Sequence, residues 1–225
     1  MMFLLKMVKS ILFKILLCIF CNQMFLFDLN PYENYYSSKP TGSVKETLEK
    51  ISENSWKISS FGDHPLFKIK QESIFSIVNG NVVLESGYRN LDVLGGLRKD
   101  YQAYKVEKEG DKKIIVYSYG KKKGSIEIEE NFYDNLTLQI QIKMNYLKED
   151  QFQINYFDKG KIKLKSFLNK RDEIIYKSNT VEVFEFTEQR EDKRYFKLLI
   201  KNDSDRETIK VFQGGRGFNV DWELD

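Results

Sequence analysis

Residues 74–85 read IFSIVNGNVVLE, in which two apolar runs meet at Asn79-Gly80. An Asn-Gly pair between apolar runs is a strong short-range hairpin signal, because both residues accept the positive φ angles of a type I′ turn. The flanking runs are rich in Ile and Val, which favour strands. This stretch therefore predicts an antiparallel β-hairpin.

The most regular alternation of apolar and polar residues lies further along, in residues 136–146, LTLQIQIKMNY. Side chains alternate between the two faces of a strand, so this pattern predicts a half-buried antiparallel strand. Residues 152–156 and 218–224 repeat the pattern. One face of the longest run would carry Leu136, Leu138, Ile140, Ile142, Met144 and Tyr146.

Turn-forming residues separate the apolar runs at intervals of roughly 8–15 residues, as in all-β domains. They lie at residues 79–80, 109–111, 120–124, 148–150, 158–160, 169–172, 202–205 and 214–217. We expect an all-β, mainly antiparallel fold: a meander of ten or more strands, arranged as a sandwich or a partly closed barrel. Residues 43–225 are expected to form this single β-rich domain.

One short amphipathic helix is expected at the start of the domain, in residues 43–54. Ser43 precedes Glu46 by three positions, which is a capping-box pattern, and Val44, Leu48 and Ile51 follow at helical spacing. Residues 22–42 contain two of the three prolines and show no periodicity. They are predicted to be a flexible tether.

Residues 1–21 have the layout of an export signal or anchor, with a lysine-bearing start and an apolar run before Cys21. Cys21 resembles the lipidated cysteine of bacterial lipoproteins, although Phe20 departs from the small residue expected there. The resemblance implies lipid attachment at Cys21 and a membrane contact through this segment. An ordinary signal, a plain membrane anchor or a cytosolic apolar N-terminus are the alternatives. An exported protein of the cell envelope, anchored, periplasmic or secreted, is expected.

The charge and cysteine content exclude several functional classes. Lys6, Lys9 and Lys14 precede the first acidic residue, and without them 33 basic residues face 33 acidic ones. A neutral body argues against a nucleic-acid partner. Both cysteines lie within residues 16–23, so the remaining chain has no thiolate nucleophile and no zinc-thiolate site. Neither a cofactor nor a metal site is predicted.

No catalytic residue is predicted either. His64, the single histidine, precedes a proline and is interpreted as an ordinary loop residue. Asp221 and Glu223 flank Trp222, but in a strand both point away from the face that holds it. Gly214 to Gly217 lack the strand-to-helix context of a phosphate loop.

Tyrosines are the remaining candidates for binding, because aromatic side chains on a rigid sheet form platforms for sugars and peptides. The alternative is that they pack in the core and use their hydroxyls in hydrogen bonds. The residues in question are Tyr32, Tyr35, Tyr36, Tyr101, Tyr104, Tyr117, Tyr119, Tyr133, Tyr146 and Tyr156.

Residues 124–142, which contain IEIEENFYDNLTLQI, resemble part of the N-terminal β-sandwich of family 31 glycoside hydrolases. The resemblance implies a sugar-binding-like sandwich without catalysis, since the chain has no room for the catalytic barrel. The main hypothesis is a non-enzymatic, envelope-anchored or secreted binding protein of unknown ligand, with carbohydrate or peptide as candidates. The alternative is a carrier of a lipid or other apolar ligand in a half-barrel, which a lined cavity would favour.

Overall fold

A computed structural model describes residues 29–38, 42–190, 194–215 and 218–225. The expected signal and Cys21 lie outside these residues. Within the described part of the chain, no helix has both the length and the apolar character needed to span a membrane. The helical segments are η1 (Leu94–Gly96), α2 (Asn135–Gln141) and the π-helical turn η2 (Ile142–Tyr146).

Fourteen strands among the described residues form one antiparallel sheet, which confirms the all-β meander. The strands are β1 (Tyr32–Ser38), β2 (Gly42–Lys50), β3 (Ser55–His64), β4 (Phe67–Val78), β5 (Asn81–Val93), β6 (Arg98–Glu109), β7 (Lys112–Tyr119), β8 (Lys122–Ile128), β9 (Gln151–Asp158), β10 (Lys161–Tyr176), β11 (Asn179–Gln189), β12 (Tyr195–Lys201), β13 (Thr208–Gly215) and β14 (Phe218–Leu224).

Strand β1 lies in the middle of this sheet, which the chain forms in two runs of strands, the first outward and the second inward. Strands β1 to β8 follow one another to one edge, and β9 to β14 return from the other edge until β14 pairs with β1. The two edge strands, β8 and β9, are not hydrogen-bonded to each other. The segment that connects them contains α2 and η2.

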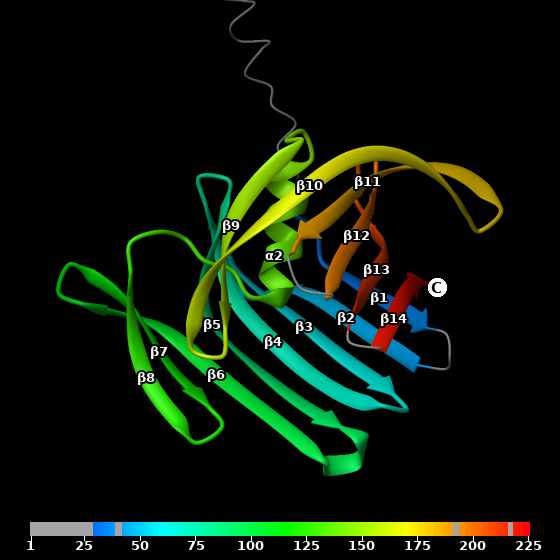
Figure 1. Cartoon of the computed structure of the whole chain (residues 1–225). Helices are drawn as coiled ribbons and strands as arrows, with labels where there is room; N and C mark the ends of the chain where they lie inside the picture. Colours follow the sequence, from blue (N-terminus) through cyan, green and yellow to red (C-terminus); the bar gives the residue numbers. More distant parts are fainter. Residues whose placement is uncertain (1–28, 39–41, 191–193, 216–217) are drawn as a thin grey trace, which may run out of the picture.

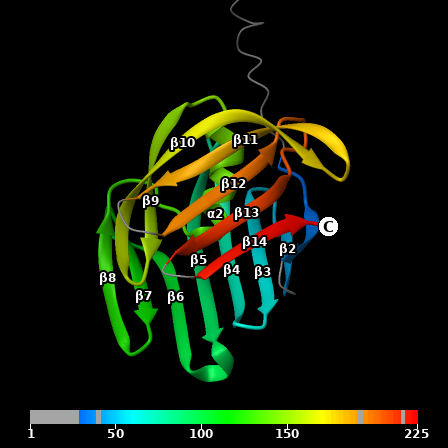
Figure 2. The same cartoon turned by 45° about the vertical axis from the view of Figure 1, so that its right-hand side comes forward.

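The sheet curls around this helix as a partly open barrel. Strands β3 to β5 lie on one side of α2 and β10 to β13 on the other (Figures 1 and 2). The main core cluster draws apolar side chains from both runs of strands and from the helix. The helix therefore fills the interior of the sheet.

Most of the expected turns are confirmed. The turn expected at residues 214–217 lies partly outside the described residues, since Gly214 and Gly215 belong to β13 and residues 216–217 are not described. Asn79 and Gly80 have φ angles of 51° and 72°, as a type I′ turn requires, and β4 pairs with β5 across them. The turn expected at residues 169–172 is wrong, because this stretch lies within β10. The chain reverses instead at Lys177 and Ser178, with φ angles of 47° and 66°.

The strand expected at residues 136–146 is also wrong, because this stretch forms α2 and η2. The preceding Asp134 caps the helix: its Oδ1 accepts hydrogen bonds from the backbone N–H groups of Leu136 (3.1 Å) and Thr137 (2.9 Å). The Thr137 hydroxyl accepts in turn from the Asp134 N–H (3.1 Å). This capping box gives the stretch a defined helical start.

Alternation misled the prediction because the helix is buried all round, so its polar residues do not mark a solvent face. Gln141 Oε1 accepts a hydrogen bond from the Val82 N–H of β5 (2.8 Å). Asn145 donates to the Gly80 carbonyl (2.8 Å) at the tip of the β4–β5 hairpin. The polar side chains thus fasten the helix to the sheet.

The N-terminal helix expected at residues 43–54 is not formed either, since most of this stretch is β2. Every second side chain, at Val44, Glu46 and Leu48, is partly or fully buried. Because Glu46 is a charged residue at an inward position, the alternation of apolar and polar residues expected of a strand is interrupted there. Its spacing from Ser43 is also that of a capping box, which led to the helix prediction. Part of the expected tether, residues 22–42, is also folded, because Tyr32–Ser38 form β1 within the sheet.

Candidate functional site

A pocket of about 90 Å³ lies inside the curled sheet, beside the first turn of α2. It is lined by both halves of the sheet, which face each other across it. The lining residues are Tyr36 of β1, Val44 and Glu46 of β2, Ser60 of β3, Phe67, Ile69 and Gln71 of β4, Asn135, Leu136 and Gln139 of α2, Phe196 and Leu198 of β12, Val211 and Gln213 of β13, and Trp222 of β14.

Aromatic rings form one wall of the pocket. Phe67 and Trp222 meet edge to face, with ring centroids 6.1 Å apart at 80°. The His64 ring stacks on Phe67, with ring centroids 5.0 Å apart, and meets Trp222 edge to face at 6.0 Å. The Nδ1 atom of His64 accepts a hydrogen bond from the Leu66 N–H (3.1 Å). Such edge-to-face packing holds rings in fixed positions, so this wall is preformed.

Glu46 is the buried carboxylate of the pocket. Its two oxygens accept hydrogen bonds from the Tyr32 hydroxyl (2.9 Å) and from Gln139 Nε2 of α2 (2.7 Å). Burial raises the pKa of Glu46 above its usual value, although the nearby ammonium of Lys143 opposes the shift. Burial lowers the pKa of Lys143 in turn. The Glu46 carboxylate is thus already engaged by groups of the protein.

Tyr36 is different, because its hydroxyl is buried in the pocket region without a hydrogen-bond partner among the described residues. Only 3% of the residue is exposed. Burial, with the negative charge of Glu46 as a second cause, raises its pKa well above the usual value, and Asn34 lies near it without a hydrogen bond of good geometry. A buried polar group without a partner costs about 1–3 kcal/mol, and a ligand group that hydrogen-bonds it would recover this cost.

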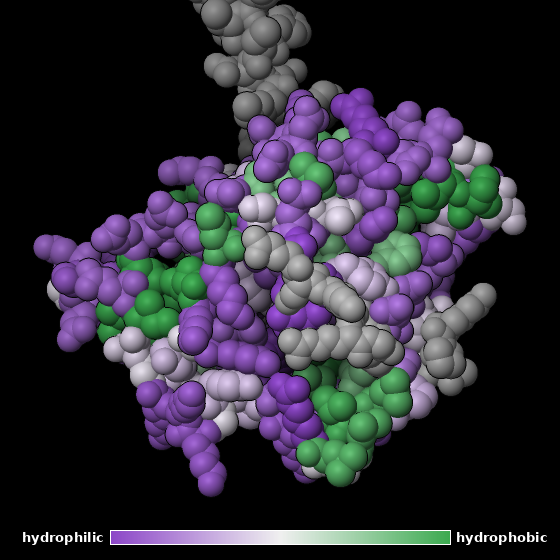
Figure 3. Space-filling model, in the orientation of Figure 1, coloured by the Kyte–Doolittle hydropathy of each residue, from purple (hydrophilic) through white to green (hydrophobic). Residues whose placement is uncertain are grey.

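Exposed leucines lie next to the aromatic wall. Leu66 immediately precedes Phe67, and its carbonyl accepts a hydrogen bond from the Leu94 N–H (2.8 Å), which brings the β3–β4 turn against η1. Leu94 and Leu97 are 51% and 82% exposed. Figure 3 shows an apolar patch at this end of the molecule, where Figure 1 places η1. We call Leu66, Leu94 and Leu97 the apolar rim; it follows Phe67 of the pocket wall along the chain but does not line the pocket.

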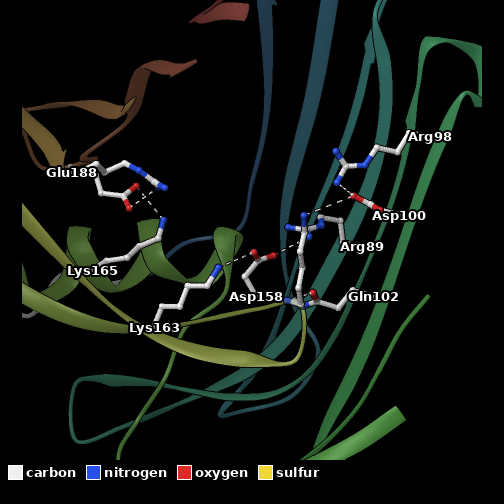
Figure 4. Close-up of polar contacts among 10 residues, drawn as sticks. Arg89, Arg98, Asp100, Gln102, Asp158, Lys163, Lys165 and Glu188 are labelled. Atoms are coloured by element: carbon white, nitrogen blue, oxygen red, sulfur yellow. Dashed lines mark hydrogen bonds and ion pairs between the residues drawn. The ribbon is translucent and has the colours of Figure 1, made fainter. Parts of the chain in front are cut away.

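A second cluster of polar groups is made of charged side chains that extend from the contact of the β9–β10 hairpin with β5 and β6 to the end of β11 (Figure 4). Arg98 and Lys163 are more than half exposed, so the cluster reaches the surface. Here each of three carboxylates contacts two cations. The groups are Asp158 with Arg89 (2.9 Å) and Lys163 (3.4 Å), Asp100 with Arg98 (2.6 Å) and Lys159 (3.8 Å), and Glu188 with Lys165 (3.1 Å) and Arg190 (3.0 Å). We call these nine residues the charged seam.

The charged seam attaches the β9–β10 hairpin to the opposite half of the sheet. Arg89 of β5 pairs with Asp158 of β9, and Gln102 of β6 accepts a hydrogen bond from the Lys159 N–H (2.6 Å). Burial acts to raise the pKa of Asp158, but the charge and hydrogen bond of Arg89 outweigh it, so this pKa lies below its usual value. The Arg89–Asp158 and Lys159–Gln102 contacts thus join β5 and β6 to the β9–β10 hairpin, although no strand pairing connects them.

The acidic pair near the C-terminus lies as the sequence predicted. Asp221 is exposed and Glu223 is half-buried, whereas Trp222 between them is buried in the pocket wall. Glu223 pairs with Lys210 (2.6 Å) on the outer face of the sheet. The loop position expected for His64 is wrong: it is the last residue of β3, is 4% exposed and packs against the rings of Phe67 and Trp222.

The tyrosines divide between the two interpretations. Tyr104, Tyr133 and Tyr156 are buried in the core, while Tyr35 and Tyr101 are exposed on different strands and form no shared platform.

Residues 121–123 form an exposed turn and the start of β8. In the described ranges, no group of three or more His, Cys, Asp and Glu side chains is arranged to hold a metal ion.

Comparison with known proteins reveals a similar fold. The chain is similar to the crystal structure of a beta-barrel-like protein of a domain of unknown function, DUF1849, from Brucella abortus, with a TM-score of 0.54. The sequences are 11% identical, and the match covers 87% of this chain and 95% of the other. No protein-family description and no curated protein matches the chain. The comparison therefore supports a beta-barrel-like fold.

Proposed function

We propose that this protein is a non-enzymatic binding protein whose pocket beside α2 receives an apolar group of its ligand. The pocket itself is the observation that carries the proposal. Its walls are mainly apolar and aromatic, with a few polar groups at fixed positions, which is the usual composition of a small-molecule site. The leucines of the apolar rim offer a matching surface for the rest of such a ligand.

The size of the pocket limits what can enter. A volume of about 90 Å³ is near three times the roughly 30 Å³ that one water molecule occupies in the liquid. Typical pockets for whole ligands measure about 300–1,000 Å³. The pocket thus accommodates a group of a few non-hydrogen atoms, such as the end of an alkyl chain, and is small for a sugar ring.

A carrier that encloses a whole lipid is the second candidate, and the lined cavity favours it. The helix argues against full enclosure, because Leu138, Ile140 and Ile142 are at most 1% exposed and fill the space that a long chain would need. A carrier would therefore hold the end of its cargo inside and leave the remainder on the rim.

The proposal includes export and anchoring through residues 1–21, with Cys21 as the lipid attachment site. Its support is the lysine-bearing start, the apolar run and the cysteine that follows. The exported protein is expected to incorporate a fatty-acid analogue, and Cys21→Ala to abolish the label. Unchanged labelling of this variant would remove the lipid attachment from the proposal.

Trp222 provides a direct test of binding, because it lies in the pocket wall and the other tryptophan, Trp56, does not line the pocket. 1-Bromobutane is small, apolar and a heavy-atom quencher of tryptophan fluorescence. We expect saturable quenching of the wild-type protein and of Trp56→Phe, and little saturable quenching of Trp222→Phe. Quenching that stays linear with concentration in all three proteins would contradict the proposal.

A matched pair of variants separates the pocket from the surface. Val44 lines the pocket, whereas Val181 is a similarly half-buried valine of β11 outside it. Val44→Phe is expected to fill the pocket and abolish saturable quenching, while Val181→Phe keeps it. Equal quenching of the two variants would place the bromobutane elsewhere.

A further inference from the structure

We infer that the pocket recognises a neutral hydroxyl group at the end of an apolar ligand, and that Tyr36 is the residue that hydrogen-bonds it. The inference rests on the proposed function and adds the chemical class of the ligand. Its basis is the contrast between Tyr36, whose hydroxyl has no partner among the described residues, and Glu46, whose two oxygens both accept hydrogen bonds. The ligand class is therefore that of alcohols and hydroxyl-bearing lipids, as opposed to fatty acids or amines.

The charges around the pocket argue against an anionic end group. Glu46 is the one acidic residue among those lining the pocket, and no lysine or arginine is among them. A ligand carboxylate would enter beside this carboxylate without a lysine or arginine in the lining. Like charges close together in a buried site repel strongly, because solvent screens them little.

A cationic end group is also disfavoured. The Glu46 oxygens already accept hydrogen bonds from Tyr32 and Gln139, and the ammonium of Lys143 lies close enough to act on its charge. An entering ammonium would lose its hydration in a buried site whose single carboxyl group is already hydrogen-bonded by the protein. Burial of a charge without a dedicated partner is costly.

A neutral hydroxyl, in contrast, matches what the pocket leaves unsatisfied. The buried Tyr36 hydroxyl can donate one hydrogen bond and accept another, and a ligand hydroxyl has the same capacity. Ser60, Gln71 and Gln213 add further neutral polar groups to the lining. The aromatic wall of Phe67 and Trp222 lies in the same pocket and can contact the adjoining alkyl carbons.

The test compares probes of one size in displacing 1-bromobutane, followed by Trp222 fluorescence at neutral pH. Butan-1-ol, butanoate and butylammonium differ in the end group, and glucose supplies hydroxyls without an alkyl chain. We expect butan-1-ol to displace the bromobutane at a concentration at least about fivefold lower than the other three. Displacement by butanoate or butylammonium at the same concentration as butan-1-ol would overturn the inference, as would preferential displacement by glucose.

Tyr36→Phe assigns the preference to a residue, with Tyr35→Phe as the control, because Tyr35 is the exposed neighbour on the other face of β1. One net hydrogen bond corresponds to roughly a 2–10-fold change in affinity. Tyr36→Phe is expected to weaken the binding of butan-1-ol by this factor and to leave the affinity for 1-bromobutane unchanged. Tyr35→Phe is expected to change the affinity for neither probe. Unaltered butan-1-ol binding to Tyr36→Phe would overturn the inference.

The proposed function and this inference fail in different ways. Absence of saturable quenching by 1-bromobutane in the wild-type protein would overturn both. Saturable quenching without a preference for butan-1-ol would leave the binding function standing and would overturn only the hydroxyl recognition. Equal weakening of bromobutane and butan-1-ol in Tyr36→Phe would have the same meaning, since it would indicate a change in pocket shape.

Discussion

The filled part of the interior, around Asp134 and the buried residues of α2, differs from the open part, which is the pocket, in what surrounds the polar groups. In the filled part, Asp134 accepts hydrogen bonds from Ser73 and Tyr104 as well as capping α2, and in the charged seam each carboxylate contacts two cations. In the open part, the Tyr36 hydroxyl is buried without a partner in the described structure and lies beside empty space. Arg89 Nε of the charged seam and Thr208 Oγ1 are also buried without a hydrogen-bond partner among the described residues, but neither residue lines the pocket. An unpartnered group next to a cavity indicates a place for a ligand.

The largest expected effect compares two leucines of the same helix. Leu138 lies in the filled part and Leu136 lines the pocket, and both are at most 2% exposed. Truncation of a buried leucine costs about 2.7–5 kcal/mol, and the cost increases with the cavity that remains. We expect Leu138→Ala near the upper end of this range in urea unfolding, and Leu136→Ala near the lower end because the pocket already relieves its packing. A larger loss at Leu136 would reverse the assignment of filled and open parts.

The charged seam is expected to contribute to stability mainly through its least exposed pair. The side chains of Arg89 and Asp158 are 20% and 16% exposed, whereas Arg98, which pairs with Asp100, is 60% exposed. Removal of one partner from a buried pair leaves the other uncompensated, so Arg89→Leu should cost about 2–3 kcal/mol. Arg98→Leu should cost under roughly 1 kcal/mol, as exposed pairs do. Equal and small losses in chemical unfolding would mean that the seam does not hold the hairpin.

Two buried tyrosine hydroxyls allow a comparison in which a smaller change in stability is expected and only one oxygen atom is removed from each side chain. The Tyr104 hydroxyl donates to Asp134, whereas that of Tyr36 has no partner among the described residues. Tyr104→Phe should destabilise the protein by about 1–3 kcal/mol, because it leaves a buried carboxylate short of a donor. Tyr36→Phe should be neutral or slightly stabilising in the absence of ligand. A clear loss of stability in Tyr36→Phe would show that its hydroxyl already has a partner.

The smallest expected effects are pH-dependent and have opposite signs in the charged seam and in the pocket. The pKa of Asp158 is lowered in the folded protein, so its contribution is present above the unfolded pKa of about 3.9 and is lost as the pH falls through the folded value. The pKa of Glu46 is raised, mainly by burial, so ionisation opposes folding as the pH increases above about 4.3. Free energies of unfolding would be measured from pH 3 to pH 7. In Asp158→Asn, the contribution of this residue to the decline at low pH should be absent. In Glu46→Gln, the free energy of unfolding should no longer decline as the pH increases above about 4.3. Identical pH profiles for the two variants would contradict these assignments.

Local chemistry predicted the sheet well and the helix badly. The turn at Asn79-Gly80 needs positive φ angles that few residue pairs accept, so the hairpin is encoded locally. Residues 136–146 alternate like a strand, but their polar residues meet partners on β2 and β5 that a local pattern does not reveal. The available signal was Asp134 with Thr137 three positions later, an N-cap that the alternation outweighed.

The pocket itself was not predicted because its residues are scattered along the chain, from Tyr36 to Trp222. Tyr36 was one of ten candidate tyrosines, and nothing in the local pattern connected it with the other lining residues. Tyr36 fell in the expected tether, and Glu46 was interpreted as a helix-capping residue. Only the curling of the sheet brings β1, β2 and β14 around the start of α2, and such long-range packing leaves no local signature.

The most direct test of the account is to locate a bound probe within the molecule. Butan-1-ol would be added to protein with labelled methyl groups, and intermolecular nuclear Overhauser effects would be recorded. The account predicts contacts to the methyls of Val44, Leu198 and Val211, which line the pocket, and none to Ile140, in the filled part. Contacts confined to the exposed leucines of the rim, or contacts to Ile140 in place of the lining residues, would contradict the claim that the pocket is the binding site.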